Sequence, residues 1–373
     1  MSVAKALRQC HNLRVWIVQL YLPLEFFLGY GTEDVNPRPH SAMSHKTFAE
    51  ARQIFLEYLA VHHYADSTQE NYPACVNAFE RYLRTHPDTA KLSPAKKIES
   101  YLTYRVLEDD VKPSTQNVEL NALILFYAAN GVRVEGINAL RARRRDYIPP
   151  ILTTEHVRAL IQNFPPEHRL VPQLLYGCAM RINEVLRLRV KDINLELQKI
   201  AIHDAKGGKD RDVSIPDKLI SPIKAQMGRA TAVWQDDITH NFNGVNCLGY
   251  EKKYPKYPKS LDWYWLFPAE SLSTDPKTGK GYMRHHVQDY FIGRLFVRLR
   301  EAHKLPVYTR PHILRHACLT HMAADMMRQG IPEKMIKAAL KDLAGHVMDQ
   351  TLDGYLHLAA PKNAVVRSPI EDL

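Results

Sequence analysis

The sequence predicts a mainly α-helical protein with a small β-sheet, divided into two domains. Most of the chain after residue 45 places apolar residues at steps of three and four, which is the period of an amphipathic helix. One short stretch, residues 200–215, alternates apolar and polar residues as a β-hairpin does. The length of 373 residues corresponds to two domains at about 150 residues per domain.

Residues 45–140 are predicted to form the first domain, a compact unit of four mostly short helices. The second of these helices is expected to start at a capping box, in which Ser67 is the N-cap and Glu70 lies three residues further on. The third and fourth helices are expected to begin at Pro94 and Pro113, because proline is well tolerated in the first turn of a helix.

Two segments flank this domain. Residues 1–44 lack the helical period that follows, and we expect them to be an N-terminal extension that is dispensable for activity. Residues 141–150 end in a Pro-Pro pair, which stops a helix and favours an extended connection, so this segment is predicted to be the linker. Its basic run is most simply a solvated segment, and the alternative is a linker that lies along phosphates. The run consists of Arg141, Arg143, Arg144 and Arg145.

Residues 151–373 are predicted to form the second domain. A helix is expected to start at Thr153, and a β-hairpin with Gly207-Gly208 between its strands interrupts the helical sequence. Residues 235–286 are rich in aromatic residues, proline and lysine, and we interpret them as an insert. Helical periods resume after this insert and continue toward the C-terminus.

Composition limits the partners and the chemistry. With 50 Lys and Arg against 40 Asp and Glu, the formal charge is +10, which favours a polyanionic partner without telling nucleic acid from a membrane surface. No stretch offers about 20 uninterrupted apolar residues, so no membrane contact is expected. The five cysteines form no CxxC or CxxH pair, which argues against a disulfide scaffold or a zinc site and fits a reducing, cytoplasmic compartment.

Residues suited to phosphoryl chemistry gather in four places in the second domain. Taken singly, each has a plain structural interpretation: an arginine and a glutamate at a helix start form a common surface ion pair, and a lone lysine in a hairpin is usually solvated. His312 and Arg315 share a helical face because they are three positions apart. The four places are Arg181 with Glu184, Lys206, His312 with Arg315, and His346 nine residues before Tyr355.

In this order the residues resemble the signature of the tyrosine recombinases, also called phage-type integrases. The surrounding text agrees: Leu-Leu-Tyr-Gly before Arg181, an Ala-Lys-Gly-Gly-Lys-Asp-Arg turn, and Pro-His-x-Leu-Arg-His. The resemblance covers roughly residues 46–370. It implies a helical core-binding (SAM-like) domain and a mixed α/β catalytic domain that close around DNA as a clamp. It also implies a homotetramer on DNA that exchanges C-terminal segments, and strand cleavage and rejoining through a 3′-phosphotyrosine.

The resemblance assigns the central roles to three residues. Tyr355 is the nucleophile, because a tyrosine oxygen can form a phosphodiester that a DNA hydroxyl later reverses. Arg181 and Arg315 offer planar, permanently charged groups that match two non-bridging phosphate oxygens. Such preorganised charge normally supplies the largest share of the rate enhancement.

The remaining residues of the signature have supporting roles. Lys206 is movable and can lose a proton, which suits the general acid at the leaving group. His312 and His346 donate to the phosphate or assist the nucleophile, and Glu184 orients the first arginine. No metal and no cofactor is implied, since the positions nearby lack carboxylates and histidines at metal-ligand spacing.

The insert resembles that of one branch, the integron integrases. Trp-x-Trp-Leu-Phe-Pro and Arg-His-His within it match that branch, which implies a folded single-stranded hairpin site with bases out of the stack. The plain alternative is that the tryptophans pack in the core and the histidines cap a helix. The predicted DNA contacts are Arg143, Arg144, Arg145, Lys209, Arg211, Lys252, Lys253, Trp263, Trp265, Pro268, Arg284, His285 and His286.

The sequence departs from the family pattern after Arg315. The 31 positions from there to His346 exceed the usual spacing, and Ala344 stands where leucine is typical. An extra helical turn or a longer loop can absorb the difference, because long loops cost little closure entropy. Three alternatives stay open: a Xer or phage-type recombinase on duplex sites, a type IB topoisomerase, and a catalytically inactive DNA-binding relative.

Overall fold

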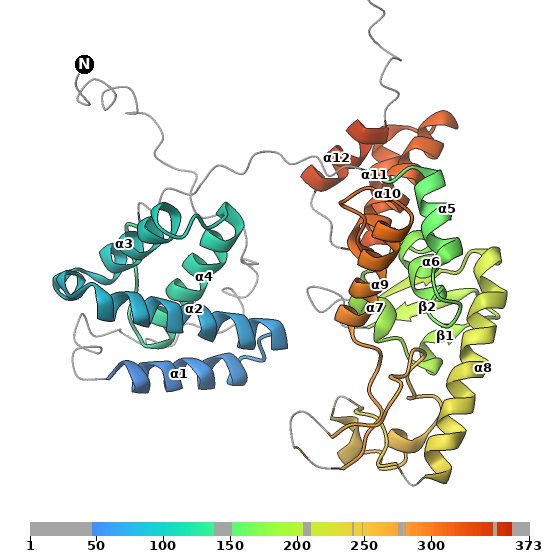
Figure 1. The fold of residues 1–373 in the computed structure, drawn as a ribbon, viewed down its shortest axis with the longest axis horizontal. Coiled ribbons are helices and arrows are strands. Elements are labelled where there is room, and N and C mark those ends of the chain that lie inside the picture. The colour runs from blue at the N-terminus through green and yellow to red at the C-terminus, as the bar shows by residue number, and fades with distance from the viewer. Residues whose placement is uncertain are drawn as a thin grey trace, which may run out of the picture. The chain divides into compact units, whose positions relative to one another are not determined.

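The computed structural model confirms a mainly helical chain with a small β-sheet (Figure 1). It describes residues 47–137, 151–203, 210–240, 242–247, 249–274, 279, 281–345 and 349–359. The chain divides into two compact units, one ending at Tyr147 and the other beginning at Ile148. Several predicted features lie outside the described residues, namely the N-terminal extension, the basic linker with Arg143, Arg144 and Arg145, and the residues Lys206, Lys209 and His346.

The described part of the first unit is helical and has an aromatic core. Four rings, Phe55, Phe79, Tyr101 and Phe126, are essentially buried. Phe55 and Phe126 meet edge to face at 5.6 Å between ring centroids, and Phe79 meets Tyr101 at 5.3 Å, which is the geometry that aromatic pairs prefer. The elements are α1 (Phe48–Val61), α2 (Asp66–Thr85), the 3-10 turn η3 (Pro87–Lys91), α3 (Pro94–Leu107) and α4 (Pro113–Ala129).

The helix starts in this unit are only partly as predicted. Helices α3 and α4 begin at the expected prolines. The capping box at Ser67 and Glu70 is wrong, because the Ala65 carbonyl accepts the first helical bonds and α2 therefore begins one residue before Ser67. A capping box does form at the start of α1, where Thr47 and Glu50 exchange bonds of 2.7 and 3.2 Å.

The second unit packs helices around a three-stranded antiparallel sheet of order β1-β2-β3. The predicted hairpin is present as β2 (Lys199–Ile202) and β3 (Arg211–Ser214), with Ile200 opposite Val213. The sequence did not predict the two-residue strand β1 (Ile193–Asn194). The helices are α5 (Thr154–Asn163), α6 (Leu170–Gly177), α7 (Ile182–Leu186), α8 (Asp217–Thr239), α9 (Asp289–Ala302), α10 (Pro311–Arg328), α11 (Glu333–Ala344) and α12 (Asp349–Ala359).

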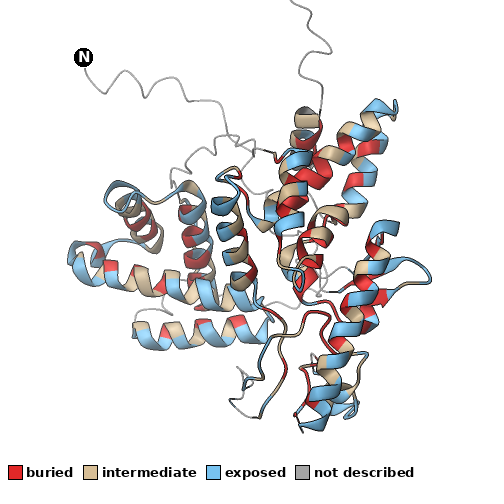
Figure 2. Ribbon diagram, turned by 45° about the vertical axis from the view of Figure 1, so that its right-hand side comes forward, coloured by how far each residue is buried: buried red, intermediate tan, exposed pale blue. Residues whose placement is uncertain are grey.

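Helix α10 occupies the interior of this unit and packs against α6, α11 and α12. Buried side chains therefore surround it on several sides, and Figure 2 shows buried residues along the inward faces of the helices. An apolar cluster that includes Leu319, Leu340 and Leu352 joins α10, α11 and α12. This cluster fixes α12, which carries Tyr355, against α10, which carries His312 and Arg315.

The insert lies at the end of the second unit that is opposite to α12 (Figure 1). Its described residues form turns and isolated bridges, including the short turns η5 (Tyr250–Lys252) and η6 (Tyr257–Lys259). A separate small core that includes Phe242, Cys247 and Tyr264 stabilises it.

Among the helices that the structure describes, none combines the length and the apolar character needed to cross a membrane.

Candidate active site

Arg181 stands at the start of α7 and is fixed there by Glu184. The backbone N–H of Arg181 donates to Glu184 Oε2 at 2.8 Å, and its Nη1 donates to Oε1 at 2.7 Å. A glutamate three residues into a helix is well placed for this, because it reaches back to the N-cap residue. The Arg181 side chain stays 25% exposed, so part of its guanidinium faces solvent.

Arg211, a predicted DNA contact, shares the same carboxylate in this structure. Its Nη1 and Nη2 donate to Glu184 Oε1 and Oε2 at 3.0 and 2.8 Å, and its side chain is 10% exposed. Burial raises the pKa of Glu184, but the hydrogen bonds from Arg211 and Arg181 outweigh it and lower the pKa to about 2. Glu184 is therefore a buried carboxylate between two arginines.

Arg315 on α10 is 2% exposed and is held by carbonyl groups. Its Nη1 donates to the Ala179 carbonyl, and its Nη2 donates to the Ala344 carbonyl at 2.6 Å. Burial, and next the nearby charge of Arg181, lower the pKa of Arg315 to about 10, against the opposing effect of Glu184. A buried cation that donates only to carbonyl groups among the described residues is suited to bind an anion.

The long spacing after Arg315 is absorbed by helices. Helix α10 runs on to Arg328 and α11 ends at Ala344, whose carbonyl returns to Arg315. The next residue, Gly345, has φ +58°, and a Cβ there would lie 3.1 Å from Arg211 Cδ. The backbone just before His346 thus lies against the arginines.

Tyr355 on α12 lies in this cluster and is 3% exposed. Its hydroxyl is 2.5 Å from His316 Nδ1, and the ring of His316 meets that of His312 at 4.4 Å between centroids. Burial raises the pKa of Tyr355 to about 12, against the lowering effect of Arg315 and Arg181. Burial, with smaller effects of His312 and Arg315, lowers the pKa of His316 to about 4, so its imidazole is neutral near pH 7.

His316 is a site residue that the sequence analysis missed. It lies four positions after His312, on the same helical face, and that spacing was the available signal. Burial also lowers the pKa of His312, and Arg315 and Arg181 add to the effect. The structure therefore brings Arg181, His312, Arg315 and Tyr355 together as predicted partners.

Two predicted DNA contacts of the insert are interior residues instead. The Arg284 guanidinium donates to Asp237, with Nε 2.9 Å from Oδ2, and to the Ala269 carbonyl at 2.9 Å. Trp265 is buried, and its Nε1 donates to the Arg284 carbonyl at 2.9 Å. Arg284 lies inside because α8 supplies a carboxylate 47 residues before it, a pairing that no local pattern indicates.

A half-exposed aromatic stack remains on the surface of the insert. Tyr254, Tyr257 and Trp263 stack in series, with ring centroids 4.6 and 5.1 Å apart and interplanar angles of 17° and 24°. The Lys191 ammonium lies 4.4 Å from the Trp263 ring centroid. The neighbouring Lys252 and Lys253 are exposed, as a phosphate contact requires.

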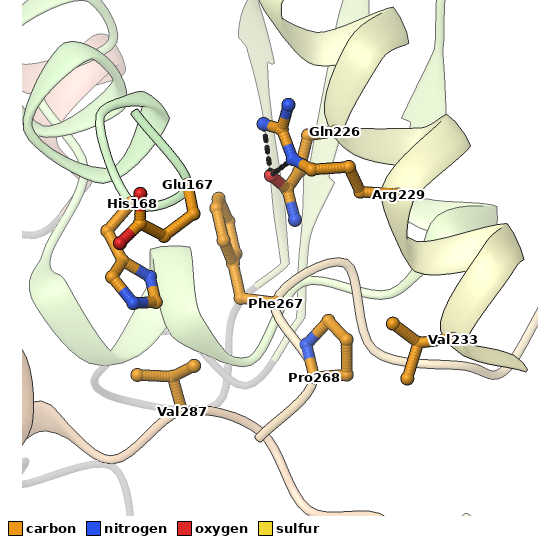
Figure 3. A pocket seen from close by; sticks show the side chains of 8 residues that line it. All are labelled: Glu167, His168, Gln226, Arg229, Val233, Phe267, Pro268 and Val287. Carbon is orange, nitrogen blue, oxygen red and sulfur yellow. Dashed lines mark hydrogen bonds between the residues drawn. The ribbon is translucent and has the colours of Figure 1, made fainter. Parts of the chain in front are cut away.

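A small pocket of about 160 Å³ opens beside Pro268 (Figure 3). Arg229 donates to Gln226 Oε1 with its Nε and Nη2 at 3.0 and 2.6 Å, which forms a polar wall. The other wall is apolar, and burial lowers the pKa of His168 at its rim. The lining residues are Glu167, His168, Gln226, Arg229, Val233, Phe267, Pro268 and Val287.

His285 and His286 are half-buried next to this pocket wall. His286 Nδ1 donates to the Val287 carbonyl at 2.8 Å, and its ring meets Trp265 edge to face at 5.0 Å. The N-cap of the next helix, α9, is Gln288, so the histidines do not cap it.

Comparisons with known proteins extend these observations. The model of the phage integrase family matches residues 150–361, and that of the phage integrase N-terminal SAM-like domain matches residues 52–130. An integrase/recombinase of Escherichia coli is 34% identical over 317 residues, which cover 83% of this chain and 90% of the relative. The tyrosine recombinase XerA of Pyrococcus furiosus is 26% identical over 334 residues, covering 87% of this chain and 96% of that protein.

Solved structures show a shared fold. The XerH site-specific recombinase bound to palindromic difH substrate superposes with a TM-score of 0.53 at 15% identity, covering 84% of this chain and 82% of that one. Lambda integrase (residues 75–356) bound to DNA superposes with a TM-score of 0.51 at 16% identity, covering 86% of this chain and 99% of that one.

Proposed function

The chain belongs to the phage integrase family, the tyrosine recombinases, and from this premise we propose that Tyr355 cleaves and rejoins DNA at specific sites through a 3′-phosphotyrosine bond. The observation that carries this proposal is the place of Tyr355. Its hydroxyl is buried against the neutral imidazole of His316. Nearby, Arg181 and Arg211 share the single carboxylate of Glu184, and Arg315 adds a further positive charge. A phosphodiester under attack gains negative charge, and this cluster supplies the opposite charge in advance.

The proton of the nucleophile goes to His316 in this proposal. A phenol with a pKa of about 12 is a poor nucleophile until it loses its proton, and His316 Nδ1 lies 2.5 Å from that hydroxyl. As the Tyr355 oxygen bonds to phosphorus, the bond from phosphorus to the 5′ oxygen breaks. The reverse step returns the proton from His316 to Tyr355.

The arginines stabilise the pentacoordinate phosphorus. A guanidinium has five N–H donors, and the described residues engage only two of those of Arg315. The exposed part of Arg181 provides the second set of donors. Binding a phosphate between them relieves the repulsion that lowers the pKa of Arg315. By resemblance, Lys206 protonates the leaving 5′ oxygen and His346 assists at the phosphate.

A nicked suicide substrate tests this proposal. When the nick lies next to the cleavage site, the leaving fragment diffuses away and the covalent protein–DNA adduct accumulates. We expect an adduct with the unchanged chain and none with Tyr355→Phe, while the control Tyr290→Phe, an exposed tyrosine of α9, reacts normally. An unchanged chain that binds DNA without forming an adduct indicates the inactive, binding-only relative. Relaxation of supercoiled DNA by single protomers indicates the topoisomerase.

A finer proposal concerns the DNA site, and we propose a folded single-stranded hairpin of a gene cassette with protruding bases. The resemblance to integron integrases implies it, and the stacked rings that end at Tyr254 support it. So does the pocket beside Pro268 (Figure 3). Aromatic stacking is worth about 1–3 kcal/mol per unpaired base. Cleavage of ordinary duplex sites by a Xer or phage-type recombinase is the alternative.

Tests on a hairpin substrate and on a linear duplex substrate distinguish these two kinds of DNA site. Replacing His285 and His286 together by alanine should weaken recombination of a hairpin with protruding bases and spare cleavage of a linear duplex site. Equal loss on both substrates would mean that the pair serves folding or general catalysis. A chain that recombines only duplex sites would favour the Xer or phage-type alternative.

The partners proposed are DNA and three further copies of this chain, and the place of action is the cytoplasm. The clamp predicts that affinity falls steeply between about 50 and 200 mM salt, because lysines and arginines release counterions from phosphates. An affinity that stays flat with salt excludes the clamp. The segment after residue 360 is proposed to pack on a neighbouring protomer, and truncation there that leaves four-protomer assembly intact would contradict that.

A further inference from the structure

Arg211 is a buried arginine to which the chemistry above gives no role. It begins β3, directly after the segment that contains Lys206, and lies far in sequence from Arg181. Both of its terminal nitrogens donate hydrogen bonds to the Glu184 carboxylate, at 3.0 and 2.8 Å. The side chain is 10% exposed and donates to Glu184, so a role through Glu184 is the one that its contacts support.

The Glu184 carboxylate is divided evenly between two arginines. Oε1 accepts from Arg211 Nη1 and from Arg181 Nη1, and Oε2 accepts from Arg211 Nη2 and from the backbone N–H of Arg181. These four bonds fill the acceptor sites that an ionised carboxylate offers. Of the two arginines, only Arg181 keeps a substantial exposed part.

We propose that Arg211 is a positioning residue for the recombination reaction and acts through Glu184 on Arg181. This inference rests on the proposed function. By taking half of the hydrogen bonds of Glu184, Arg211 holds the carboxylate in one orientation, so that the free donors of Arg181 face the phosphate. Arg211 also leaves the group of Arg181, Arg211 and Glu184 with a net positive charge, because two cations share one anion.

Loss of Arg211 would change both effects. Two acceptor sites of a buried carboxylate would lose their partners, which is costly, and Glu184 would turn more fully onto Arg181. The phosphate would then meet an arginine whose charge is cancelled by its neighbour. Gly345 would also lose a packing contact, because the Arg211 side chain lies where a Cβ of Gly345 would point.

The first measurement is single-turnover cleavage of the nicked substrate. Arg211→Met should lower the rate on the order of 100-fold, as expected when a catalytic group is misplaced, with little change in DNA affinity. Arg211→Lys keeps the charge but loses the two-pronged geometry, so its rate should fall between those of Arg211→Met and the unchanged chain. Equal losses in affinity and rate would instead mark Arg211 as a DNA contact.

Modified phosphates then show which group Arg211 serves. A methylphosphonate at the cleavage site removes the charge of one non-bridging oxygen and with it much of the need for Arg181. On that substrate the deficit of Arg211→Met should shrink to less than about threefold if Arg211 acts through Arg181. Rescue by a 5′-bridging sulfur, which leaves without an acid, would place the effect on Lys206 and overturn the proposal. Rescue by neither substrate would mean a purely structural role and overturn it too.

A double-mutant cycle tests the link to Glu184 without any cleavage. Arg211→Met should lower the unfolding temperature because it strands a buried carboxylate, and adding Glu184→Gln should restore part of it, because a neutral amide needs no second cation. Additive losses would overturn the proposal even if the chain formed no adduct. If the cycle shows coupling and the unchanged chain forms no adduct, the recombinase proposal fails and the structural link stands.

Discussion

The active-site cluster and the insert both bury arginines, but they compensate the charge differently. In the insert, Arg284 faces Asp237, which also accepts from the Tyr264 hydroxyl at 2.5 Å. Burial lowers the pKa of Arg284, but the bonds to Asp237 outweigh it and raise the pKa. In the cluster, Arg315 has only carbonyl partners among the described residues, and its pKa falls to about 10. The charge of Arg284 is therefore neutralised by a carboxylate, and the charge of Arg315 is not.

Arg189, which precedes the insert in the sequence and contacts it, is an intermediate case. It donates to the carbonyls of Trp263 and Asn246 at 2.6 and 2.7 Å, and its guanidinium carbon lies 3.9 Å from the Trp265 ring centroid. The negative faces of aromatic rings partly replace a carboxylate here. The comparison teaches that burial alone does not mark an arginine as catalytic. What separates Arg315 from the other two is that its charge lies, without a carboxylate partner among the described residues, beside the proposed nucleophile Tyr355.

The largest effect is expected at Arg315. Arg315→Met should slow cleavage about 1,000-fold, since it removes a preorganised cation from the transition state. Its unfolding temperature should change less than that of Arg284→Met, because no buried carboxylate is left unpaired. Single-turnover rates and thermal unfolding of the two variants provide the measurement. If Arg284→Met slows cleavage as strongly while remaining folded, the distinction between the two regions fails.

The second prediction concerns the stability of the insert. Arg284→Met should lower the free energy of unfolding by about 3–5 kcal/mol, because it leaves Asp237 buried without its cation. Adding Asp237→Leu should recover most of this loss, as removal of both charges often does. Urea unfolding of the two variants measures the change. Failure of the second substitution to recover stability would show that the carboxylate serves another partner, such as the Tyr264 hydroxyl.

The sequence predicted four residues that the structure brings together and the contact of Glu184 with Arg181, but not the long-range contacts of the cluster. The order of Arg181, His312, Arg315 and Tyr355 along the chain was enough to assemble the site by resemblance. The bond between Arg211 and Glu184 joins residues 27 positions apart, and that between His316 and Tyr355 joins residues 39 apart. Local periodicity carries no information on such contacts, so an arginine that donates to a carboxylate was predicted to be a DNA contact.

The fold shows the same limit. Helices with a clear apolar stripe and a proline at the start were predictable, as was the hairpin of β2 and β3. Strand β1 has two residues, too few for an alternating pattern to be visible. In the insert, aromatic residues and arginines suggested a DNA surface. Arg284 and Trp265 are interior because Asp237 and Arg189 come to them from other elements.

The third prediction is a pH effect that is strongest in the cluster. In the second unit, burial lowers the pKa of His316 to about 4 from 6.5, so the folded state prefers the neutral ring. Its contribution to stability is therefore complete above pH 6.5 and is lost as the pH falls toward 4. One histidine contributes a slope of at most about 1.4 kcal/mol per pH unit.

Single substitutions show which histidine causes this pH dependence of the unfolding free energy. His316→Gln should flatten the dependence of unfolding free energy on pH, measured by urea titration across this range. His286→Gln in the insert, where burial also lowers the pKa, provides the matched comparison. His312 and Arg315, which face His316, remain in both proteins. An unchanged slope in His316→Gln would mean that other groups titrate in this window.

The smallest effect is expected at Lys191, which lies over a ring of the insert and tests the aromatic compensation there. Its ammonium and the Arg189 guanidinium both lie over Trp263, at 4.4 and 5.1 Å from the ring centroid, so each weakens the attraction of the other. Removing the half-exposed cation loses an interaction of about 0.5–1 kcal/mol and relieves part of that repulsion. Lys191→Met should therefore change the free energy of unfolding by less than about 1 kcal/mol and leave duplex cleavage unchanged. Thermal unfolding and single-turnover cleavage check both expectations. A loss of cleavage comparable to that of Arg315→Met would mean that the cations that contact the rings of the insert take part in catalysis. The contrast between neutralised and uncompensated arginines would then no longer separate the two regions.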